Sequence, residues 1–271
     1  MSNNLFTKNI LLLILLIVGN ELHAQYSYNK LVWKDEFNTT GNLPDSNKWS
    51  YDNGNGCPDI CGWGNNELQY YTTRRTENTR IENGILVIEA RKENFNGAKY
   101  TSARLVTKHK GDWKYGRLEI KAKLTSGKGM WPAIWMLPTN WEYGAWPHSG
   151  EIDIAENVGY LPDSLFGTVH TGAFNGMIGT QKSKSISIND LSTAFHVYAI
   201  EWTKDNIGFY IDGKKYHVFE NNHSGTEAWP FDKEFHLLLN VAVGGNWGGK
   251  YGVDDAIFPQ KMEVDYVRVY Q

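Results

Sequence analysis

Three acidic residues crowd one short stretch of this sequence: Glu151, Asp153 and Glu156. The first two alternate with isoleucines, which is the pattern of a β-strand with one buried face and one open face. On a regular strand Glu151 and Asp153 point to the same face, whereas Glu156 points to the opposite one. One extra residue, Ala155, would form a β-bulge and return Glu156 to the side of the other two. The stretch therefore predicts a bulged strand with three carboxylates on one face.

Acidic residues on an exposed strand face are often merely solvated, and this alternative stays open. Like charges on one face repel each other unless protonation or function compensates. The flanking segments are rich in Trp, Gly and Pro, which suits a binding site better than a plain surface. A close pair of carboxyl groups with separated pKa values is what retaining glycoside hydrolysis requires. Glycoside cleavage is therefore the working hypothesis.

Aromatic residues gather next to the acidic stretch. The chain contains 11 Trp and 15 Tyr, more than the core of one sandwich needs. Four tryptophans come just before the acidic strand: Trp131, Trp135, Trp141 and Trp146. Sugar rings pack their C–H faces on aromatic rings while their hydroxyls hydrogen-bond to polar neighbours, so this pattern favours a polysaccharide as partner. Three other tryptophans are assigned to the core: Trp33, Trp49 and Trp202.

The elements that must position these residues are predicted to be β-strands. Residues 117–124 alternate charged and apolar side chains with a period of two. Residues 81–88 and 209–216 each centre on a hairpin dipeptide, Asn-Gly in the first and Asp-Gly in the second. We find no amphipathic helix of normal length and no Pro/Ser-rich linker. Many strands joined by Gly-rich turns predict an all-β fold of two antiparallel sheets packed face to face in one domain.

The first 24 residues are predicted to be a signal peptide. Lys8 precedes an unbroken apolar run over residues 10–18, and Ala24 ends the segment with a small residue. The apolar run is too short for an ordinary membrane span. We therefore expect an exported protein, secreted or periplasmic, with one domain over residues 25–271 and no membrane attachment after cleavage. The formal net charge of −3 gives no argument for nucleic acid as a partner, and a monomer is the default expectation.

The two cysteines, Cys57 and Cys61, lie four positions apart in a Gly- and Asn-rich segment. In an exported protein this pair predicts a local disulfide. A zinc site would need further cysteine or histidine ligands nearby, and a redox pair usually has the spacing Cys-x-x-Cys.

Motifs spread over nearly the whole predicted mature chain resemble those of the family 16 glycoside hydrolases. They include residues 33–37 (Trp-Lys-Asp-Glu-Phe), 62–72 (Gly-Trp-Gly-Asn-Asn-Glu-Leu-Gln-Tyr-Tyr-Thr), 100–104, 131–138, 170–171, 240–245 and 264–270. Each motif is weak alone, but their ordered combination is specific. Within the family, the chain is similar to the laminarinase-like endo-1,3-β-glucanases. The resemblance implies a β-jelly-roll sandwich whose concave sheet forms an open substrate cleft for a β-glucan.

The resemblance also implies roles for individual residues. Glu151 would be the nucleophile of a retaining mechanism and Glu156 its general acid/base, while Asp153 between them would raise the pKa of the acid. The bulged motif E-x-D-x-x-E is shared by laminarinases, agarases and carrageenases, whereas mixed-linkage lichenases carry a form one residue shorter. The residues implied for substrate binding are Asn65, Arg104, Trp131, Trp135, Trp146, His170 and Trp247.

The carboxylate mechanism needs no metal or other cofactor. Many members of the family nevertheless hold a structural calcium ion away from the cleft. The positions that match in this sequence are Glu36, the backbone of Gly84 and Asp265, and hard oxygen ligands of this kind suit calcium. The resemblance alone implies this site.

Two other functions stay open. A hydrolase with the same fold can act on mixed-linkage glucan, agarose or carrageenan, although no Lys/Arg cluster flanks the acidic strand as a sulfated substrate would favour. A non-catalytic glucan-binding protein on the same scaffold would lack the catalytic glutamates, and both are present here.

Overall fold

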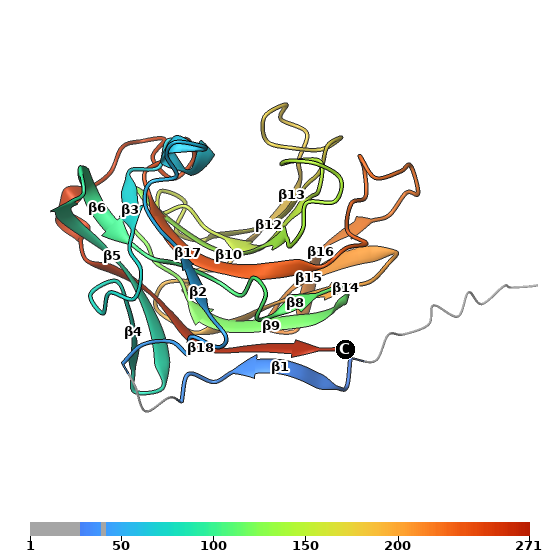
Figure 1. The fold of residues 1–271 in the computed structure, drawn as a ribbon, viewed down its shortest axis with the longest axis horizontal. Coiled ribbons are helices and arrows are strands. Elements are labelled where there is room, and N and C mark those ends of the chain that lie inside the picture. The colour runs from blue at the N-terminus through green and yellow to red at the C-terminus, as the bar shows by residue number, and fades with distance from the viewer. Residues whose placement is uncertain (1–27, 39–41) are drawn as a thin grey trace, which may run out of the picture.

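The computed structural model describes residues 28–38 and 42–271, so the predicted signal peptide lies outside the described residues. The described chain forms two β-sheets that lie one above the other (Figure 1), with two short 3-10 helices, η1 (Cys61–Gly64) and η2 (Asp255–Ile257). The prediction of an all-β sandwich is therefore confirmed. Among the described residues, no helix has the length and apolar character needed to span a membrane.

The larger sheet has ten strands, in the order β16-β15-β14-β9-β18-β5-β6-β3, with β1 beside β18 and β4 beside β5. All of its pairs are antiparallel except β3 with β6, which is parallel. Its strands are β1 (Leu31–Asp35), β3 (Gln69–Tyr71), β4 (Thr79–Glu82), β5 (Ile85–Phe95), β6 (Ala98–Ser102), β9 (Gly116–Lys123), β14 (His196–Trp202), β15 (Asn206–Ile211), β16 (Lys214–Glu220) and β18 (Gln260–Tyr270).

The smaller sheet has eight strands, in the order β13-β12-β11-β10-β17-β7-β2, with β8 beside β17. Its strands are β2 (Ser50–Asp52), β7 (Arg104–Val106), β8 (Asp112–Trp113), β10 (Met130–Pro138), β11 (Glu151–Glu156), β12 (Ser164–His170), β13 (Lys182–Ser187) and β17 (Phe235–Val243). The acidic stretch is thus a strand near the middle of this sheet, between β10 and β12.

Local sequence explains the two hairpins that were predicted. Asn83 and Gly84 join β4 to β5, and both have positive φ angles, 52° and 79°. Asp212 and Gly213 join β15 to β16 with φ angles of 47° and 77°. Positive φ at both central residues defines the type I′ turn, which Asn-Gly and Asp-Gly favour because it matches the twist of paired strands. Both predicted hairpins are confirmed.

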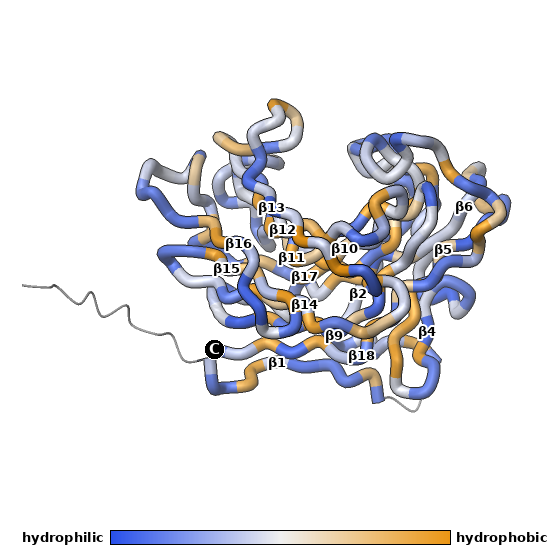
Figure 2. The backbone as a smooth tube through the Cα atoms, turned by 180° about the vertical axis from the view of Figure 1, so that it is seen from behind, coloured by the Kyte–Doolittle hydropathy of each residue, from blue (hydrophilic) through white to orange (hydrophobic). Residues whose placement is uncertain are grey.

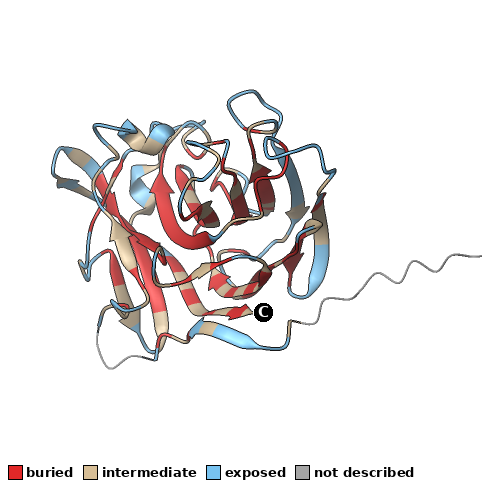
Figure 3. Ribbon diagram, turned by 45° about the vertical axis from the view of Figure 1, so that its right-hand side comes forward, coloured by how far each residue is buried: buried red, intermediate tan, exposed pale blue. Residues whose placement is uncertain are grey.

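The hydrophobic core lies between the two sheets. On β9 the apolar residues Leu118, Ile120 and Ala122 are fully buried, while the charged residues between them lie on the outer surface. Apolar residues recur along the strands of both sheets (Figure 2), and buried residues concentrate in the strands while exposed ones lie mainly in loops (Figure 3). Trp49 and Trp202 are buried in this core as predicted, and Trp33 is half-buried and packs against it.

The face of the eight-stranded sheet turned away from the core is called the open face below. Its residues follow from the register of the strands. Ala133 of β10 pairs with Glu156 of β11, and Trp135 pairs with Asp153 on one side and with Leu238 of β17 on the other. Loops rise above this sheet on both sides (Figure 1). The open face is therefore where the acidic strand presents its carboxylates.

Candidate active site

Strand β11 carries a bulge at the position that the sequence predicted. The pairing of β11 with β12 shifts register between Asp153 and Glu156, and its pairing with β10 shifts at the same point. Ile154 and Ala155 both enter the hydrophobic core. Two consecutive inward residues put Glu156 on the same side as Asp153, which is what a bulge does to the alternation of a strand. The predicted bulge is confirmed.

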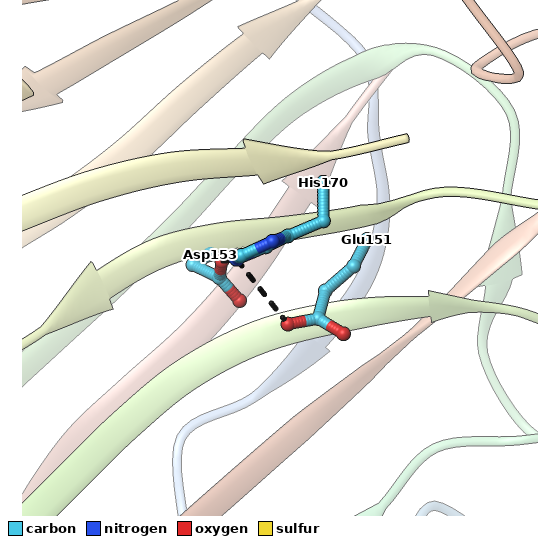
Figure 4. A group of neighbouring side chains, drawn as sticks. All are labelled: Glu151, Asp153 and His170. Carbon is cyan, nitrogen blue, oxygen red and sulfur yellow. Dashed lines mark ion pairs between the residues drawn. The ribbon is translucent and has the colours of Figure 1, made fainter. Parts of the chain in front are cut away.

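His170 of β12 lies beside two of the three carboxylates (Figure 4). Its Nε2 is 3.3 Å from Asp153 Oδ2 and 4.0 Å from Glu151 Oε1. The backbone N–H of Gly176 donates to Nδ1 of the same ring at 3.2 Å. Because Nδ1 accepts, a neutral imidazole carries its proton on Nε2, the nitrogen that forms the ion pairs with Asp153 and Glu151. The loop after β12 thereby determines which ring nitrogen of the histidine carries the proton in its neutral form.

The two outer carboxylates each accept a hydrogen bond from an indole. Trp146 Nε1 donates to Glu151 Oε2 at 2.7 Å, and Trp131 Nε1 donates to Glu156 Oε1 at 3.0 Å. An indole N–H is a donor only, so it fixes a carboxyl oxygen without being able to take its proton. The sequence analysis predicted that these two tryptophans bind substrate. The structure adds that their indole N–H groups donate hydrogen bonds to the two glutamates.

Burial separates the protonation behaviour of these carboxyl groups. Glu156 is buried, and burial raises its pKa well above the usual range, with the charge of Asp153 adding to the effect and the Trp131 hydrogen bond opposing it. Burial likewise raises the pKa of Asp153 well above the usual range, and the neighbouring charge of Glu151 raises it further. Two of the three groups therefore tend to hold protons, as a general acid must.

Arg104 and Trp135 stand on the open face next to the acidic strand. The Arg104 guanidinium is buried, forms an ion pair with Asp52 at 2.7 Å and lies 3.9 Å from the centre of the Trp63 ring. Trp135 Nε1 donates to Asn240 Oδ1 at 2.7 Å. Both side chains are held rigidly by these contacts, which suits residues that position a ligand.

Trp247 and Asn65 lie in loops at one end of the acidic strand. The Trp247 ring packs edge-on against Trp131 at 5.5 Å and against Phe166 at 5.1 Å between ring centres. The carbonyl of Asn65 accepts a hydrogen bond from the backbone N–H of Asn246 at 2.7 Å. The seven residues predicted to bind substrate thus lie on the open face or in contact with loops that flank it.

Sequence reasoning missed several polar residues that the structure brings to the same region: Asp52, Glu67, Tyr71 and Asn240. Asn240 is polar within the otherwise largely apolar run of β17, and it is buried. That interruption was a usable signal, because a polar residue inside a buried strand must find a partner. Glu67 and Tyr71 lie in a motif that carried the family resemblance, but nothing local distinguished them from their neighbours.

Glu151, Asp153 and His170 form a group whose ligand-type atoms all lie within 4.8 Å of one another. By residue type such a group can hold a metal ion. The Gly176 N–H at Nδ1 argues against this use, because it leaves the proton on Nε2, whereas a metal would need the lone pair there. The group fits a hydrogen-bonded carboxyl network better than a metal centre.

The residues predicted to hold calcium lie elsewhere, on the ten-stranded sheet and its turns. Both carboxylate oxygens of Glu36 accept from the Arg268 guanidinium, at 2.8 and 2.9 Å. Asp265 Oδ2 forms an ion pair with Lys121 Nζ at 2.7 Å. The two side chains therefore fit ion pairs better than a shared calcium ion, and the calcium site stays a prediction.

Cys57 and Cys61 are joined by a disulfide with an S–S distance of 2.06 Å. The bond closes the segment that leads into η1, which contains Trp63. It therefore lies in the loop that brings the Trp63 ring against Arg104.

The arrangement as a whole can perform acid–base and nucleophilic chemistry on a glycosidic bond. Glu151 and Glu156 lie on one face of one strand, with a buried acid at one end and a hydrogen-bonded carboxylate at the other. Two carboxyl groups in distinct environments are the common apparatus of glycoside hydrolysis. Aromatic rings around them offer surfaces for sugar rings.

Comparison with known proteins agrees with this chemistry. A family model described as glycosyl hydrolases family 16 matches residues 66–268. The chain is 52% identical over 262 residues to the beta-glucanase of Rhodothermus marinus, which covers 94% of this chain and 90% of that protein.

Solved structures resemble the fold over most of its length. One is the X-ray structure of the laminarinase from Rhodothermus marinus, with a TM-score of 0.86 and 53% identity, covering 89% of this chain and 97% of that one. Another is a mutant of SCLam, described as a non-specific endo-β-1,3(4)-glucanase of family 16 and co-crystallised with 1,3-β-D-cellotriosyl-glucose. It gives a TM-score of 0.84 and 51% identity, covering 89% of this chain and 94% of that one.

Proposed function

The chain belongs to glycosyl hydrolase family 16, and we propose that it is an endo-acting β-glucanase that hydrolyses 1,3-β-D-glucosidic linkages with retention. The observation that carries this proposal is the bulged strand β11, which presents Glu151, Asp153 and Glu156 on one face. The similarity to a laminarinase over most of both chains supports the choice of substrate.

In the first step of the proposed mechanism, Glu151 attacks the anomeric carbon of the sugar and the glycosidic C–O bond breaks. Glu156 gives its proton to the departing oxygen, so the leaving chain ends in a hydroxyl group. The raised pKa of Glu156 keeps that proton available near neutral pH. The hydrogen bond from Trp146 holds the other oxygen of Glu151 and aims the carboxylate.

In the second step, the glycosyl–enzyme ester formed with Glu151 is hydrolysed. Glu156, now ionised, takes a proton from water, and the resulting hydroxide attacks the anomeric carbon from the side that the first leaving group vacated. The bond to Glu151 breaks and its carboxylate returns. Two inversions at one carbon give net retention, and Glu156 ends the cycle protonated.

Asp153 and His170 are proposed to respond to the change in charge at the two glutamates during the reaction. Asp153 lies between them on the strand, with its Oδ2 3.3 Å from Nε2 of His170. When Glu151 loses its negative charge in the ester, the pKa of Asp153 falls, because that charge is one of its causes. The protonation of Asp153 thus follows the charge on Glu151.

Mixed-linkage 1,3-1,4-β-glucan is the second candidate substrate. It is favoured by the similarity to SCLam, described as a non-specific endo-β-1,3(4)-glucanase. The two candidates share the same chemistry at the anomeric carbon and differ only in the sugar rings that the open face accepts beside it.

The test is product analysis on laminarin, lichenan and agarose side by side. We expect short oligosaccharides from laminarin early in the reaction, as an endo-acting enzyme gives, and proton NMR should show the β-anomer as the first product. Equal rates on lichenan would establish the broader specificity. Release of the α-anomer first would contradict retention, and products from agarose alone would contradict the glucanase assignment.

Export of the protein is also proposed, on the evidence of the first 24 residues of the sequence. N-terminal sequencing of protein recovered from the periplasm or the medium should begin at or near Gln25. A protein that keeps Met1 and stays inside the cell would contradict the proposal. Light scattering on the same sample tests the expected monomer.

A further inference from the structure

We propose that Glu67 is a positioning residue: its carboxylate ends a one-directional hydrogen-bond chain that runs through Tyr71 and Asn240 and fixes the ring of Trp135 on the open face. The chain of hydrogen bonds is independent of what the enzyme cleaves. Only the claim that Trp135 binds glucan rests on the proposed function.

The direction of the chain follows from its first donor. The Trp135 indole can only donate, so the atom of Asn240 that faces it at 2.7 Å must be the amide oxygen. The amide nitrogen of Asn240 then points the other way and donates to Tyr71 Oη at 3.0 Å. Because that oxygen accepts from Asn240, the hydroxyl proton of Tyr71 is free to point onward.

Glu67 receives that proton. Its Oε2 accepts from Tyr71 Oη at 3.4 Å and from Gln69 Nε2 at 2.6 Å. The orientation of the Gln69 amide is itself fixed, because its oxygen accepts from the backbone N–H of Val243 at 2.7 Å. Two donors, Gln69 Nε2 and Tyr71 Oη, therefore converge on one carboxyl oxygen. An acceptor is required at this point.

Burial makes the acceptor necessary. Tyr71 is fully buried, and Gln69 and Asn240 are only 1% and 5% exposed, so none of them can turn to water for a replacement partner. A buried donor without an acceptor destabilises the folded state, because it loses its bond to water and gains none in the protein. Without Glu67 the Tyr71 hydroxyl would do best by reversing and donating to Asn240. The Asn240 amide would then turn over and present its nitrogen to the Trp135 N–H, donor against donor.

The hydrogen-bond chain ends at Trp135, next to the acidic strand. Trp135 pairs in register with Asp153 of the acidic strand, and its half-buried ring lies 5.7 Å from the Arg104 guanidinium. A shift of the ring would alter the surface offered to a sugar next to the reacting bond. Glu67 itself is half-buried and lies beside Gly245, whose missing side chain leaves room for it next to Trp131.

A simpler role for Glu67 would be a direct hydrogen bond to a sugar hydroxyl. Three variants separate the two roles. Glu67→Leu removes the acceptor at similar size, Glu67→Gln keeps an oxygen acceptor without the charge, and Tyr71→Phe breaks the chain in the middle. Glu77→Leu is the matched control, because Glu77 is an exposed glutamate whose ion pair is with Arg75.

The first measurement needs no substrate. In the ¹H–¹⁵N spectrum the chain should show 11 indole N–H signals, and the signal lost in Trp135→Phe identifies Trp135. We expect Glu67→Leu and Tyr71→Phe to move that signal and to speed its exchange with solvent by about tenfold or more, while Glu67→Gln and Glu77→Leu leave it in place. If the Trp135 signal does not move in a folded Glu67→Leu protein, the proposed hydrogen-bond chain is refuted.

The second measurement is steady-state kinetics on laminarin oligosaccharides. Glu67→Leu should raise KM about tenfold with a smaller effect on kcat, since a lost buried acceptor corresponds to a change of that order. Glu67→Gln should stay within about twofold. In the double variant of Glu67 and Tyr71 the effects should not add, because both break one chain.

The outcomes distinguish the proposals from each other. Additive effects of Glu67→Leu and Tyr71→Phe on KM, or a Glu67→Gln variant as impaired as Glu67→Leu, would overturn positioning in favour of direct sugar contact. A wild-type protein that cleaves no β-glucan would contradict the proposed function. The spectroscopic result would still test the hydrogen-bond chain from Trp135 to Glu67. If Glu67→Leu does not fold, the Tyr71→Phe and Glu67→Gln spectra still test it.

Discussion

Carboxylates occur on two faces of this sandwich and have opposite environments. On the open face, Glu151, Asp153 and Glu156 face one another, and among the described residues their only ion-pair partner is His170. On the outer face of the ten-stranded sheet, acidic and basic side chains pair throughout. Arg117 pairs with Glu119 at 2.7 Å and with Glu201 at 2.8 Å, Lys121 pairs with Asp265, and Lys123 pairs with Glu263.

The two faces show that the same residue types serve structure or chemistry according to their neighbours. A carboxylate next to a guanidinium or ammonium group keeps its charge and has a lowered pKa, as Glu36 does beside Arg268. A carboxyl group that is buried without a cation holds its proton, as Glu156 does. The outer face therefore uses its acids as fixed charges, and the open face keeps acids that can exchange protons.

The largest expected effect comes from replacing the glutamates of the open face. Glu151→Gln removes the nucleophile and Glu156→Gln removes the transferable proton, so each should lower kcat/KM on laminarin about 10³-fold or more. Glu201→Gln on the outer face removes a carboxylate of the same type and should change kcat/KM less than about twofold. Reducing-end release measures all three.

Circular dichroism of the three variants is the control, because loss of folding would imitate loss of chemistry. A folded Glu151→Gln enzyme that keeps wild-type activity would refute the catalytic assignment. An outer-face variant that loses as much activity as the two open-face variants would remove the distinction between the faces.

The sequence predicted those features of the open face that depend on residues close together in the chain. The parity of Glu151, Asp153 and Glu156 predicted the bulge because strand alternation is a local rule. The hairpins at Asn83 and Asp212 were predictable for the same reason, since a turn type depends on two residues.

Other features of the site depend on residues that are far apart in the chain. Asn240 meets Tyr71 across 169 positions, and no spacing rule connects them. The proton position on His170 depends on the backbone N–H of Gly176 in a loop whose path the sequence does not specify. The family resemblance supplied residue identities but not these contacts, which arise only when the two sheets and their loops come together.

The next effect tests how the carboxyl groups of the open face influence one another. When Asp153 is ionised its charge raises the pKa of Glu156, so Asp153→Asn, which cannot ionise, should lower that pKa. Because Glu156 must be protonated to act as the acid, activity is lost as pH rises through its pKa, and the alkaline limb of the kcat/KM profile should move to lower pH. At pH 7 we expect a loss of about 10- to 100-fold.

A pH–rate profile of wild type and Asp153→Asn measures this shift. An unchanged alkaline limb would mean that Asp153 does not act through Glu156. Glu201→Gln is the control, since it removes a carboxylate charge from the outer face and should leave the limb in place.

Trp131→Phe should move the same limb in the opposite direction. The indole N–H stabilises the ionised form of Glu156 and lowers its pKa. Phenylalanine keeps an aromatic ring beside Trp247 but cannot donate, so the pKa of Glu156 rises and the alkaline limb moves to higher pH. Loss of one hydrogen bond to an ionisable group corresponds to about 1.5–3 kcal/mol, and we expect kcat/KM to fall about tenfold. A limb that moves downwards would contradict the role of the indole.

The smallest effect belongs to the outer face and concerns stability instead of rate. Glu36→Gln removes the charge that pairs with Arg268, where the two side chains are 26% and 33% exposed. Partly exposed ion pairs contribute about 0.2–1 kcal/mol, so Tm should fall by no more than about 4 °C. Activity should not change. Differential scanning calorimetry at neutral pH measures the difference.

The pH dependence of this difference identifies its cause. Arg268 lowers the pKa of folded Glu36 below its ordinary value of 4.5, so the pair stabilises the folded state above about pH 4.5 and stops doing so as pH falls through the lowered pKa. The Tm values of wild type and Glu36→Gln should therefore converge in acid. A difference that persists there, or a wild-type Tm that falls in a chelator while the variant's does not, would replace the ion pair with the predicted calcium ion as the stabilising partner of Glu36.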